Sequence, residues 1–303
     1  MKAVVQTQYG GPETLHLVKV LKPSFNDDEF LVKVHATNIA SGDMRVNTLS
    51  VNAFLKPIMR LVFGFKGPRS KIRGISASGE IVGLGKNITE YKLKDKIYFI
   101  NSMKAGCLAE YIVLNKKSIT ALKPENISYT EAAPIAFGAM SAYHFINQKN
   151  IKEGQEVLIY GASGSVGSYA IQLAKYYGAV VTAVSSEKNH EKLLALGADC
   201  VIDYHKNDFR TINKQYDVIF DAVLKISKKS CKAVLKQGGK YLSVISPTKE
   251  SKERLKELNE IINKGKLVTL IDTVYPFKDF REAHKHTYTG HKVGNVVVEI
   301  IES

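Results

Sequence analysis

Cysteine is scarce in this chain of 303 residues, and its cysteines lack the spacing of a metal site. Cys107, Cys200 and Cys231 lie far apart and form no C-x-x-C pair. An odd number of separated cysteines argues against a disulfide framework and is typical of proteins in the reducing cytosol. We therefore expect a cytoplasmic protein.

Long apolar runs are missing as well. No stretch approaches the ~20 apolar residues that a membrane-spanning helix needs. The segment Met1–Thr7 turns polar after a short apolar pair, which predicts a first strand and not a secretory signal. The hydrophobic share of 45% nevertheless permits a sizeable core, and the length has room for two domains of ordinary size. We expect no membrane partner.

A motif for nucleic acid is the third absence. The formal net charge is +14, which is the feature that raises the question. The excess lysines are scattered along the chain, without a basic cluster interleaved with aromatic residues. A lysine-rich solvated surface accounts for them, so we expect no nucleic-acid partner.

What is present falls into two patterns. Residues 1 to about 125 contain short strand-like segments separated by glycine and proline turns, which is typical of an irregular β-barrel. The candidate strands are Ala3–Thr7, His16–Val20, Phe30–Ala36, Gly79–Gly83, Lys96–Asn101 and Ala109–Val113. The tail segment Asn295–Ile300 also has strand character, so the C-terminus is expected to complete this first domain.

Beyond residue 127 the pattern changes to alternating helices and strands. Glu131–Asn147 is apolar and alanine-rich, which indicates a buried helix or helix pair. Strands are predicted at Glu156–Tyr160, Ala179–Val184, Asp217–Val223 and Lys240–Ile245, and helices at Val166–Tyr177, His190–Leu196, Ser227–Leu235 and Ser251–Asn263. Repeated βα units predict an α/β fold with a doubly wound parallel sheet.

A glycine-rich loop joins the strand Glu156–Tyr160 to the next helix. It consists of Gly161, Ala162, Ser163, Gly164, Ser165, Val166 and Gly167. Such a turn lets the backbone approach a dinucleotide pyrophosphate, which the helix N-terminus then binds with unpaired N–H groups. Ala162 stands where the G-x-G-x-x-G form has its first glycine. We predict dinucleotide binding here; a ligand-free glycine turn is the alternative.

The end of the second strand decides between NAD and NADP. NAD sites place an acidic residue about 20 positions after the glycine turn, whereas this chain has Ser185 and Ser186, followed by Lys188 and Asn189. These groups can donate hydrogen bonds to a 2′-phosphate that a carboxylate would repel. An ordinary polar loop would explain the serines equally well, and Glu187 lies close by. We predict NADP(H).

Several motifs together resemble the medium-chain dehydrogenase/reductases, and among them the zeta-crystallin-like quinone oxidoreductases. The resemblance runs nearly end to end, and its motifs are Met1–Val4, Val32–Ala36, Gly74–Gly85, Ala109–Tyr111, Glu131–Ala133, Gly161–Gly167 and Gly197–Asp199. It implies a GroES-like catalytic domain over 1–125, completed by about 273–303, and a Rossmann NADP(H)-binding domain over 126–272. It also places Tyr204 near the 2′-phosphate.

The same resemblance locates missing metal ligands. The zinc-dependent alcohol dehydrogenases of this superfamily have a cysteine where this chain has Ala40, and a Gly-His-Glu triplet where it has Gly74-Ile75-Ser76. Their third ligand falls near Ala133-Pro134. His284, His286 and His291 cluster in the sequence, but we expect them in a surface segment. We predict no metal site.

Without a Lewis acid, hydride transfer to a quinone or an α,β-unsaturated carbonyl is the expected reaction. The candidate catalytic residues are Asn38, Ser41 and Asp43 of the cleft-lining segment in the family, although Asp43 is more readily explained as a structural support. Two alternatives stay open. One is a zinc-free carbonyl or alcohol dehydrogenase, and the other is a non-catalytic NADPH-binding or RNA-associated protein.

The resemblance finally predicts an altered oligomer. In these relatives a sixth sheet strand pairs with its copy in a second subunit. Here only five residues, 246–250, separate the strand Lys240–Ile245 from the helix that begins near Ser251, and one of the five is Pro247. Since this leaves no room for another strand, we expect about five parallel strands. Their edge would be charged by Lys249, Lys252, Glu253, Arg254 and Lys256, and the usual dimer of the family would be altered or absent.

Overall fold

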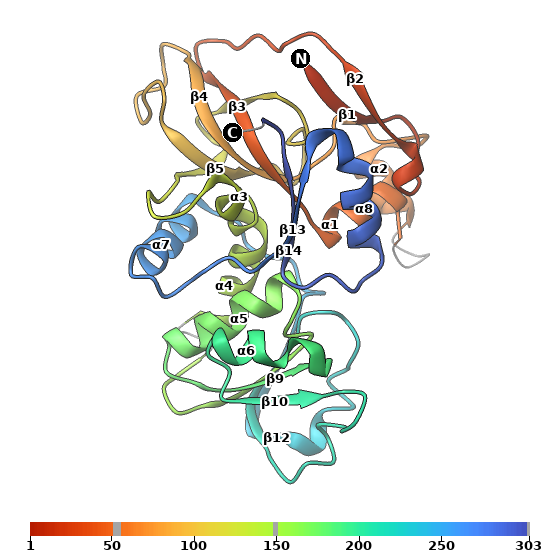
Figure 1. Cartoon of the computed structure of the whole chain (residues 1–303), viewed down its shortest axis with the longest axis vertical. Helices are drawn as coiled ribbons and strands as arrows, with labels where there is room; N and C mark the ends of the chain where they lie inside the picture. Colours follow the sequence, from red (N-terminus) through yellow and green to blue (C-terminus); the bar gives the residue numbers. More distant parts are fainter. Residues whose placement is uncertain (51–55, 148–150, 302–303) are drawn as a thin grey trace. The chain divides into compact units, whose positions relative to one another are not determined.

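A computed structural model describes residues 1–50, 56–147 and 151–301. The chain divides into two compact units, one formed by Met1–Phe137 with Ile271–Ser303 and the other by Gly138–Leu270 (Figure 1). No helix in the described residues is long and apolar enough to cross a membrane.

The first unit is built mainly on antiparallel strands. Its strands are β1 (Lys2–Gln6), β2 (Leu15–Lys19), β3 (Glu29–Ile39), β4 (Ser76–Leu84), β5 (Lys96–Ile100), β6 (Tyr111–Asn115), β7 (Ile119–Leu122), β13 (Ile271–Pro276) and β14 (Asn295–Glu299). Six of them form a path in the order β13-β14-β3-β4-β5-β7, β6 pairs with β3, and β1 and β2 form a separate ribbon. The tail strand β14 is thus inserted between β3 and β13, and β13 and β14 pair in parallel.

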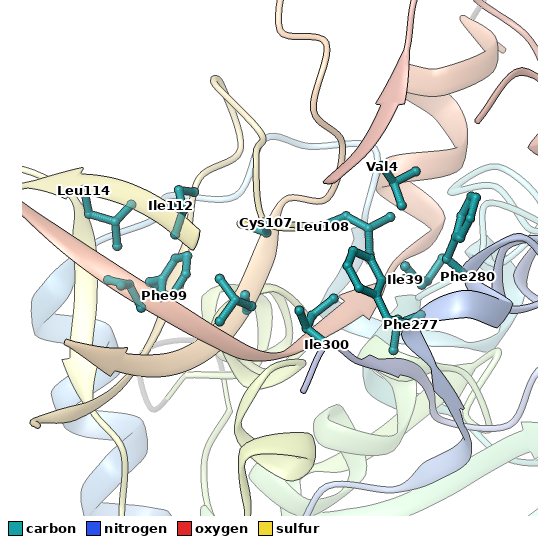
Figure 2. Packing of buried hydrophobic residues seen from close by; sticks show 14 of the residues in the cluster. Val4, Ile39, Phe99, Cys107, Leu108, Ile112, Leu114, Phe277, Phe280 and Ile300 are labelled. Carbon is teal, nitrogen blue, oxygen red and sulfur yellow. The ribbon is translucent and has the colours of Figure 1, made fainter. Parts of the chain in front are cut away.

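The α-helices that the described residues of this unit form are α1 (Ser41–Thr48), α2 (Lys56–Phe63), α3 (Tyr129–Ala132) and α8 (Phe280–Tyr288). The core gathers residues from both ends of the chain, as Figure 2 shows for Val4, Phe99, Leu108, Phe277 and Ile300. Burial of such side chains contributes roughly 1.5–3 kcal/mol each, so the C-terminal segment is an integral part of this unit.

The second unit is a parallel sheet with helices. Its elements are α4 (Met140–Ile146), β8 (Glu156–Tyr160), α5 (Ser165–Tyr176), β9 (Val180–Ser185), α6 (His190–Ala195), β10 (Cys200–Asp203), β11 (Tyr216–Asp221), β12 (Leu235–Ser243) and α7 (Lys252–Asn263). The strand order is β10-β9-β8-β11-β12, and every pairing is parallel. The expected Rossmann sheet of five strands is confirmed for the described residues.

The charged edge is arranged differently from the expectation. Lys252, Arg254 and Lys256 lie on α7, which contacts α4. The edge strand β12 instead carries Lys236 and Lys240. Lys240 still places a cation on this edge strand, whereas Lys236 is paired with the Asp217 carboxylate at 2.8 Å. A charged edge discourages pairing with another strand.

The helix predicted at Ser227–Leu235 is wrong. Only a single 3₁₀ turn, Lys232–Val234, forms there, and β12 already begins at Leu235. The Oγ of Ser227 accepts a hydrogen bond from the Ser230 N–H at 3.1 Å, while the Ser230 hydroxyl bonds the Ser227 carbonyl at 2.9 Å. Serine side chains that bond nearby backbone groups in this way offer an alternative to a continuous helix.

Candidate functional site

The glycine loop of the second unit is a tight turn from β8 into α5. The N–H groups of Gly161 and Ala162 both donate to the Val184 carbonyl of β9, at 3.2 and 3.1 Å. Gly161 has a φ of +77°, which favours glycine. A Cβ on Gly167 would lie 2.3 Å from the Gly161 carbonyl oxygen, so only glycine lets the helix pack this closely on the strand.

Gly164 and Ala162 test whether a pyrophosphate fits over this turn. A Cβ on Gly164 would meet only the Gly161 oxygen, at an ordinary 3.4 Å. Nothing in the described protein therefore requires glycine at Gly164, whereas a pyrophosphate lying on the backbone would. The Ala162 side chain is fully buried, so its methyl group points away from solvent. The departure from the glycine pattern is thus compatible with a dinucleotide.

The first turn of α5 faces the same site. Gly164 is the N-cap, and Ser165 and Val166 are the first helical residues. The N–H groups of a first turn have no acceptor within their own helix and carry partial positive charge. Together with Ser163 in the loop, they form a cradle that suits an anionic diphosphate.

The end of β9 supplies hydroxyl groups. The Ser185 hydroxyl donates to the Ser186 carbonyl at 3.0 Å, and the Asn189 amide donates to Ser186 Oγ at 3.1 Å. Because Ser186 Oγ accepts this bond, its own hydrogen can be directed to a ligand oxygen. Asn189 is buried and serves to orient Ser186.

Tyr204 and Lys206 lie beside this end of β9. Ser185 pairs with Asp203 in the β9–β10 register, and the Tyr204 N–H donates to the Ser185 carbonyl at 3.4 Å. Lys206 Nζ lies 2.7 Å from the Glu187 carboxylate. Glu187, the acid that would repel a 2′-phosphate, is therefore paired with a cation. Lys188 adds a second exposed cation.

Sequence reasoning missed a neighbouring pocket. A cavity of about 490 Å³ is lined by Tyr160, Tyr204, Asn207, Asp208, Phe209, Arg210, Leu224, Lys225, Ile226, Ser227 and Ser230. These residues follow the carboxyl ends of β8, β10 and β11, where open α/β sheets bind ligands. The Asp208 carboxylate holds the Arg210 guanidinium in a fork, with contacts from 2.6 to 3.0 Å, and raises the pKa of that guanidinium.

Buried Asp221 shapes the wall of this pocket. Its carboxylate accepts hydrogen bonds from the N–H groups of Val223, Lys225 and Ile226 at 3.1 to 3.4 Å. It also accepts one from the Tyr241 hydroxyl at 3.2 Å. Burial, and to a smaller extent the nearby Asp221 carboxylate, raises the pKa of Tyr241 to about 12. The predicted strand Asp217–Val223 contained this acid, and the observed strand β11 ends at it.

The three candidate catalytic residues of the first unit have different surroundings. Asn38 is the penultimate residue of β3 and is buried, and neither amide atom has a partner among the described residues. Ser41 is exposed at the start of α1. Asp43 Oδ2 accepts the Ala40 N–H at 3.0 Å, which supports the start of α1. Burial raises the Asp43 pKa to about 6, and its hydrogen bond from Ala40 and nearby Arg73 oppose that rise.

Arg73 is buried behind α1. Its Nε donates to the Asn47 side-chain oxygen at 2.7 Å, and its Nη1 donates to the Ser70 carbonyl at 3.2 Å. Burial lowers the pKa of Arg73, while the Asp43 carboxyl opposes this effect. Asp43 and Arg73 therefore act first as internal supports of this segment.

Apolar side chains and one buried serine occupy the positions that the family resemblance assigns to zinc ligands. Ala40, Ile75 and Ala105 form a buried cluster against Phe137. Ser76 is buried, and Ala133 packs with Ala36 and Val297. In residues 1–50, 56–147 and 151–301, no three His, Cys, Asp or Glu side chains are grouped as a metal site.

The expected surface position of His284 is wrong. His284 is buried on α8 with Phe280, Ala283 and Thr287, at the helical spacing of one face. Its Nδ1 donates to the Phe280 carbonyl at 2.8 Å, and burial lowers its pKa to about 4. His286, in contrast, is half-buried and lies 3.1 Å from the Asp272 carboxylate.

A second cavity lies within the first unit. It has a volume of about 460 Å³, and its walls are Val46, Val62, Phe63, Arg69, Ser70, Arg73, Ile75, Met103, Lys104 and Ala105. It adjoins the apolar cluster through Ile75 and Ala105. Its lining is apolar and cationic and contains no acid among these residues.

Comparison with known proteins agrees with this architecture. The family model described as "Zinc-binding dehydrogenase" matches residues 165–287. The NADPH-dependent alkenal/one oxidoreductase (chloroplastic) of Arabidopsis thaliana is 32% identical over 319 residues, which cover 98% of this chain and 79% of that protein. The 2-methylene-furan-3-one reductase of Solanum lycopersicum is 31% identical, with 99% and 79% covered. The structure of the quinone oxidoreductase from Coxiella burnetii superimposes with a TM-score of 0.83 at 26% identity, covering 99% of both chains.

Proposed function

This chain belongs to the medium-chain dehydrogenase/reductase superfamily, in its quinone oxidoreductase-like branch, and we propose that it uses NADPH to reduce quinones or α,β-unsaturated carbonyl compounds. The observation that carries the proposal is the Gly161–Gly167 turn, with Ser186 and paired Glu187 at the end of the next strand. We further propose that the unit Gly138–Leu270 is the nucleotide-binding domain and that the other unit is the catalytic domain.

The protein's contribution to cofactor binding follows from its own groups. Bound NADPH supplies the hydride. The N–H groups of the loop and of the first turn of α5 would hold the diphosphate, and the Ser186 hydroxyl and Lys188 would hold the 2′-phosphate. Tyr204 and Arg210 border the adjoining pocket and offer a flat surface and a cation for the adenosine end. Sequence reasoning had not identified Arg210.

The acceptor is assigned to the 460 Å³ cavity of the first unit. Hydride addition to the β-carbon of an unsaturated carbonyl places negative charge on the carbonyl oxygen, and one preorganised N–H or O–H donor stabilises that charge. We assign this donation to the Asn38 amide, whose Nδ2 has no partner in the described residues, or to the Ser41 hydroxyl. Neither residue lines the cavity, but their segment packs against its wall through Ala40, which clusters with Ile75 and Ala105. Asp43 supports the helix that carries Ser41.

An acceptor screen tests the proposal. Purified protein and NADPH are mixed with quinones, unsaturated aldehydes and ketones, and matched saturated aldehydes. Oxidation of NADPH is expected with the first two classes only. Turnover of saturated aldehydes alone would identify a zinc-free carbonyl dehydrogenase. Binding of NADPH without turnover of any acceptor would identify a non-catalytic protein.

The cellular setting remains part of the proposal. All three cysteines are unpaired, and Cys200 is exposed, which suits a reducing compartment such as the cytosol. Fractionation with an antibody against the protein tests this assignment. The proposed partner is a small-molecule acceptor, and no nucleic acid is required for the reaction.

A further inference from the structure

Helix α2 and the turn after it present apolar side chains to solvent. The helix spans Lys56–Phe63 and has no buried residue. Ile58, Leu61 and Phe65 are exposed by 58%, 63% and 66%, and Met103 by 69%. Exposed apolar groups that gather on one surface mark an interaction site more often than isolated ones do.

Met103 belongs to the same surface as α2. The 460 Å³ cavity is lined by Val62 and Phe63 of the helix, by Arg69, and by Met103 and Lys104. Val62 and Met103 therefore line the proposed acceptor cavity, whereas the exposed Ile58, Leu61 and Phe65 are not among its lining residues. We call Ile58, Leu61, Val62, Phe65 and Met103, with the neighbouring cations Lys56, Arg60, Lys66 and Lys104, the α2 surface.

The turn that carries Phe65 is held in place. The Arg69 N–H donates to the Phe63 carbonyl at 2.6 Å, and Arg69 Nη2 donates to the Leu61 carbonyl at 2.9 Å. Gly64 has a φ of +124°, and a Cβ there would lie 2.1 Å from the Gly67 carbonyl oxygen. Only glycine permits this turn, which places Phe65 and Lys66 at its exposed tip.

The positive charge around α2 indicates an anionic partner. From Met44 to Gly79 the chain has no Asp or Glu but seven cations: Arg45, Lys56, Arg60, Lys66, Arg69, Lys71 and Arg73. The basic residues were expected to be scattered, but several of them lie on α2 or beside the adjoining cavity. A second copy of the chain would oppose cations with cations, which disfavours self-association. A short helix with exposed apolar side chains and Lys or Arg beside them suits the interface of an anionic bilayer.

We propose that the α2 surface docks on anionic phospholipid membranes and so brings the acceptor cavity to lipid-soluble quinones or enones. The expectation of no membrane partner rested on the lack of a spanning segment, and docking at the surface needs none. The docking rests on the α2 surface alone, whereas the choice of acceptor also rests on the proposed function.

Vesicle binding tests the docking without any catalytic step. The full chain is sedimented with vesicles of phosphatidylcholine, alone or mixed with phosphatidylglycerol. Binding is expected only to the mixed vesicles, and it should weaken as salt shortens the Debye length from ~30 Å at 0.01 M to ~8 Å at 0.15 M. Equal binding to both vesicles, or to neither, would overturn the proposal.

Three variants locate the surface. The triple variant Lys56→Gln, Arg60→Gln, Lys66→Gln should lower partition roughly a hundredfold, from the contribution of each cation near an anionic surface. Ile58→Ser, Leu61→Ser, Phe65→Ser should lower it at least tenfold with the charge unchanged. Lys92→Gln, Lys117→Gln, Lys192→Gln removes the same charge from exposed lysines elsewhere and should bind like the wild type. If this control loses as much vesicle binding as the first variant, the net charge of the protein explains the loss, and the assignment to the α2 surface is overturned.

A competing polyanion and a second acceptor complete the design. RNA is added as a competitor of vesicle binding. If RNA displaces the vesicles, and its own binding depends on the cations of the α2 surface but not on Phe65, the surface binds nucleic acid instead. If the docking is right, the apolar variant should reduce a quinone embedded in mixed vesicles more slowly than the wild type, yet reduce a water-soluble quinone equally well. If the wild type binds the mixed vesicles but reduces neither quinone, the proposed function fails while the docking stands.

Discussion

Lys206 Nζ lies 2.7 Å from the Glu187 carboxylate, at the carboxyl edge of the parallel sheet. Glu187 follows β9 and Lys206 follows β10, so the pair spans two neighbouring strand ends. Both side chains are mostly exposed, and such a pair contributes little to stability. Its effect is electrostatic, because it offsets an exposed acid beside the proposed 2′-phosphate site.

The protein should bind NADPH more tightly than NADH. Each charge-assisted contact to the 2′-phosphate contributes ~1.5–3 kcal/mol, which is about tenfold or more. Lys206→Gln should weaken NADPH binding two- to fivefold while NADH binding is nearly unchanged, a size expected for an exposed pair. Fluorescence titration measures both constants, with Lys192→Gln as control. Equal constants for the two cofactors in the wild type would refute the assignment.

Alanine at Gly167 should lower the stability of the fold, whereas alanine at Gly164 should lower the affinity for NADPH. Gly167→Ala forces a Cβ to 2.3 Å from the Gly161 oxygen and should destabilise the fold by ~1–3 kcal/mol. Gly164→Ala meets no close atom, so its stability should change by less than ~1 kcal/mol while NADPH affinity falls. Urea unfolding and NADPH titration separate the two. Unchanged NADPH affinity in Gly164→Ala would mean that no diphosphate lies on this backbone.

Two buried groups should make opposing contributions to the pH dependence of stability. The His284 pKa is lowered from 6.5 to about 4, so the unfolded chain binds a proton in that window that the folded chain does not. Acidification therefore costs stability through His284. The Asp43 pKa is raised from 3.8 to about 6, so the folded chain binds the extra proton and acidification adds stability.

Single substitutions should separate these contributions. Relative to the wild type, His284→Gln should gain up to ~3 kcal/mol in free energy of unfolding as the pH falls from 6.5 to 4. Asp43→Asn should lose a similar amount between pH 6 and 3.8. Urea unfolding across this range measures both. Parallel pH profiles for wild type and both variants would show that these groups are not shifted by burial.

Chelation should leave the activity unchanged. Ala40 and Ile75 pack together in an apolar cluster that offers no ligand atom. Treatment with EDTA should not alter NADPH oxidation, and elemental analysis should find no stoichiometric zinc. About one zinc per chain would mean that other residues bind the metal.

A dimer continuous through paired Rossmann edge strands should not form. The described part of the sheet ends at β12, which carries Lys236 and Lys240. Sedimentation velocity over a range of concentrations measures the oligomer. If a dimer is found, hydrogen exchange over residues 235–243 shows whether β12 lies in the dimer interface. Strong additional protection of this strand on dimerisation would contradict the prediction.

The sequence by itself determined the local parts of the nucleotide site. The strand Glu156–Tyr160, the glycine turn and the helix beginning at Ser165 depend on neighbouring residues, since burial pattern, turn and helix start are all local signals. The short segment 246–250 likewise limited the parallel sheet to five strands, because a proline and four further residues cannot form another strand with its turns.

Only the tertiary structure decided what depends on distant partners. β13 is a strand because β14 pairs with it, and His284 is buried because α8 packs on elements from the other end of the chain. The predicted helix at Ser227–Leu235 was wrong because β12 begins at Leu235 and pairs with β11, while serine side chains bond the backbone before it. The Lys206–Glu187 pair and the Arg210 pocket arise where separate strand ends meet, a proximity created by β-pairing and invisible to sequence spacing.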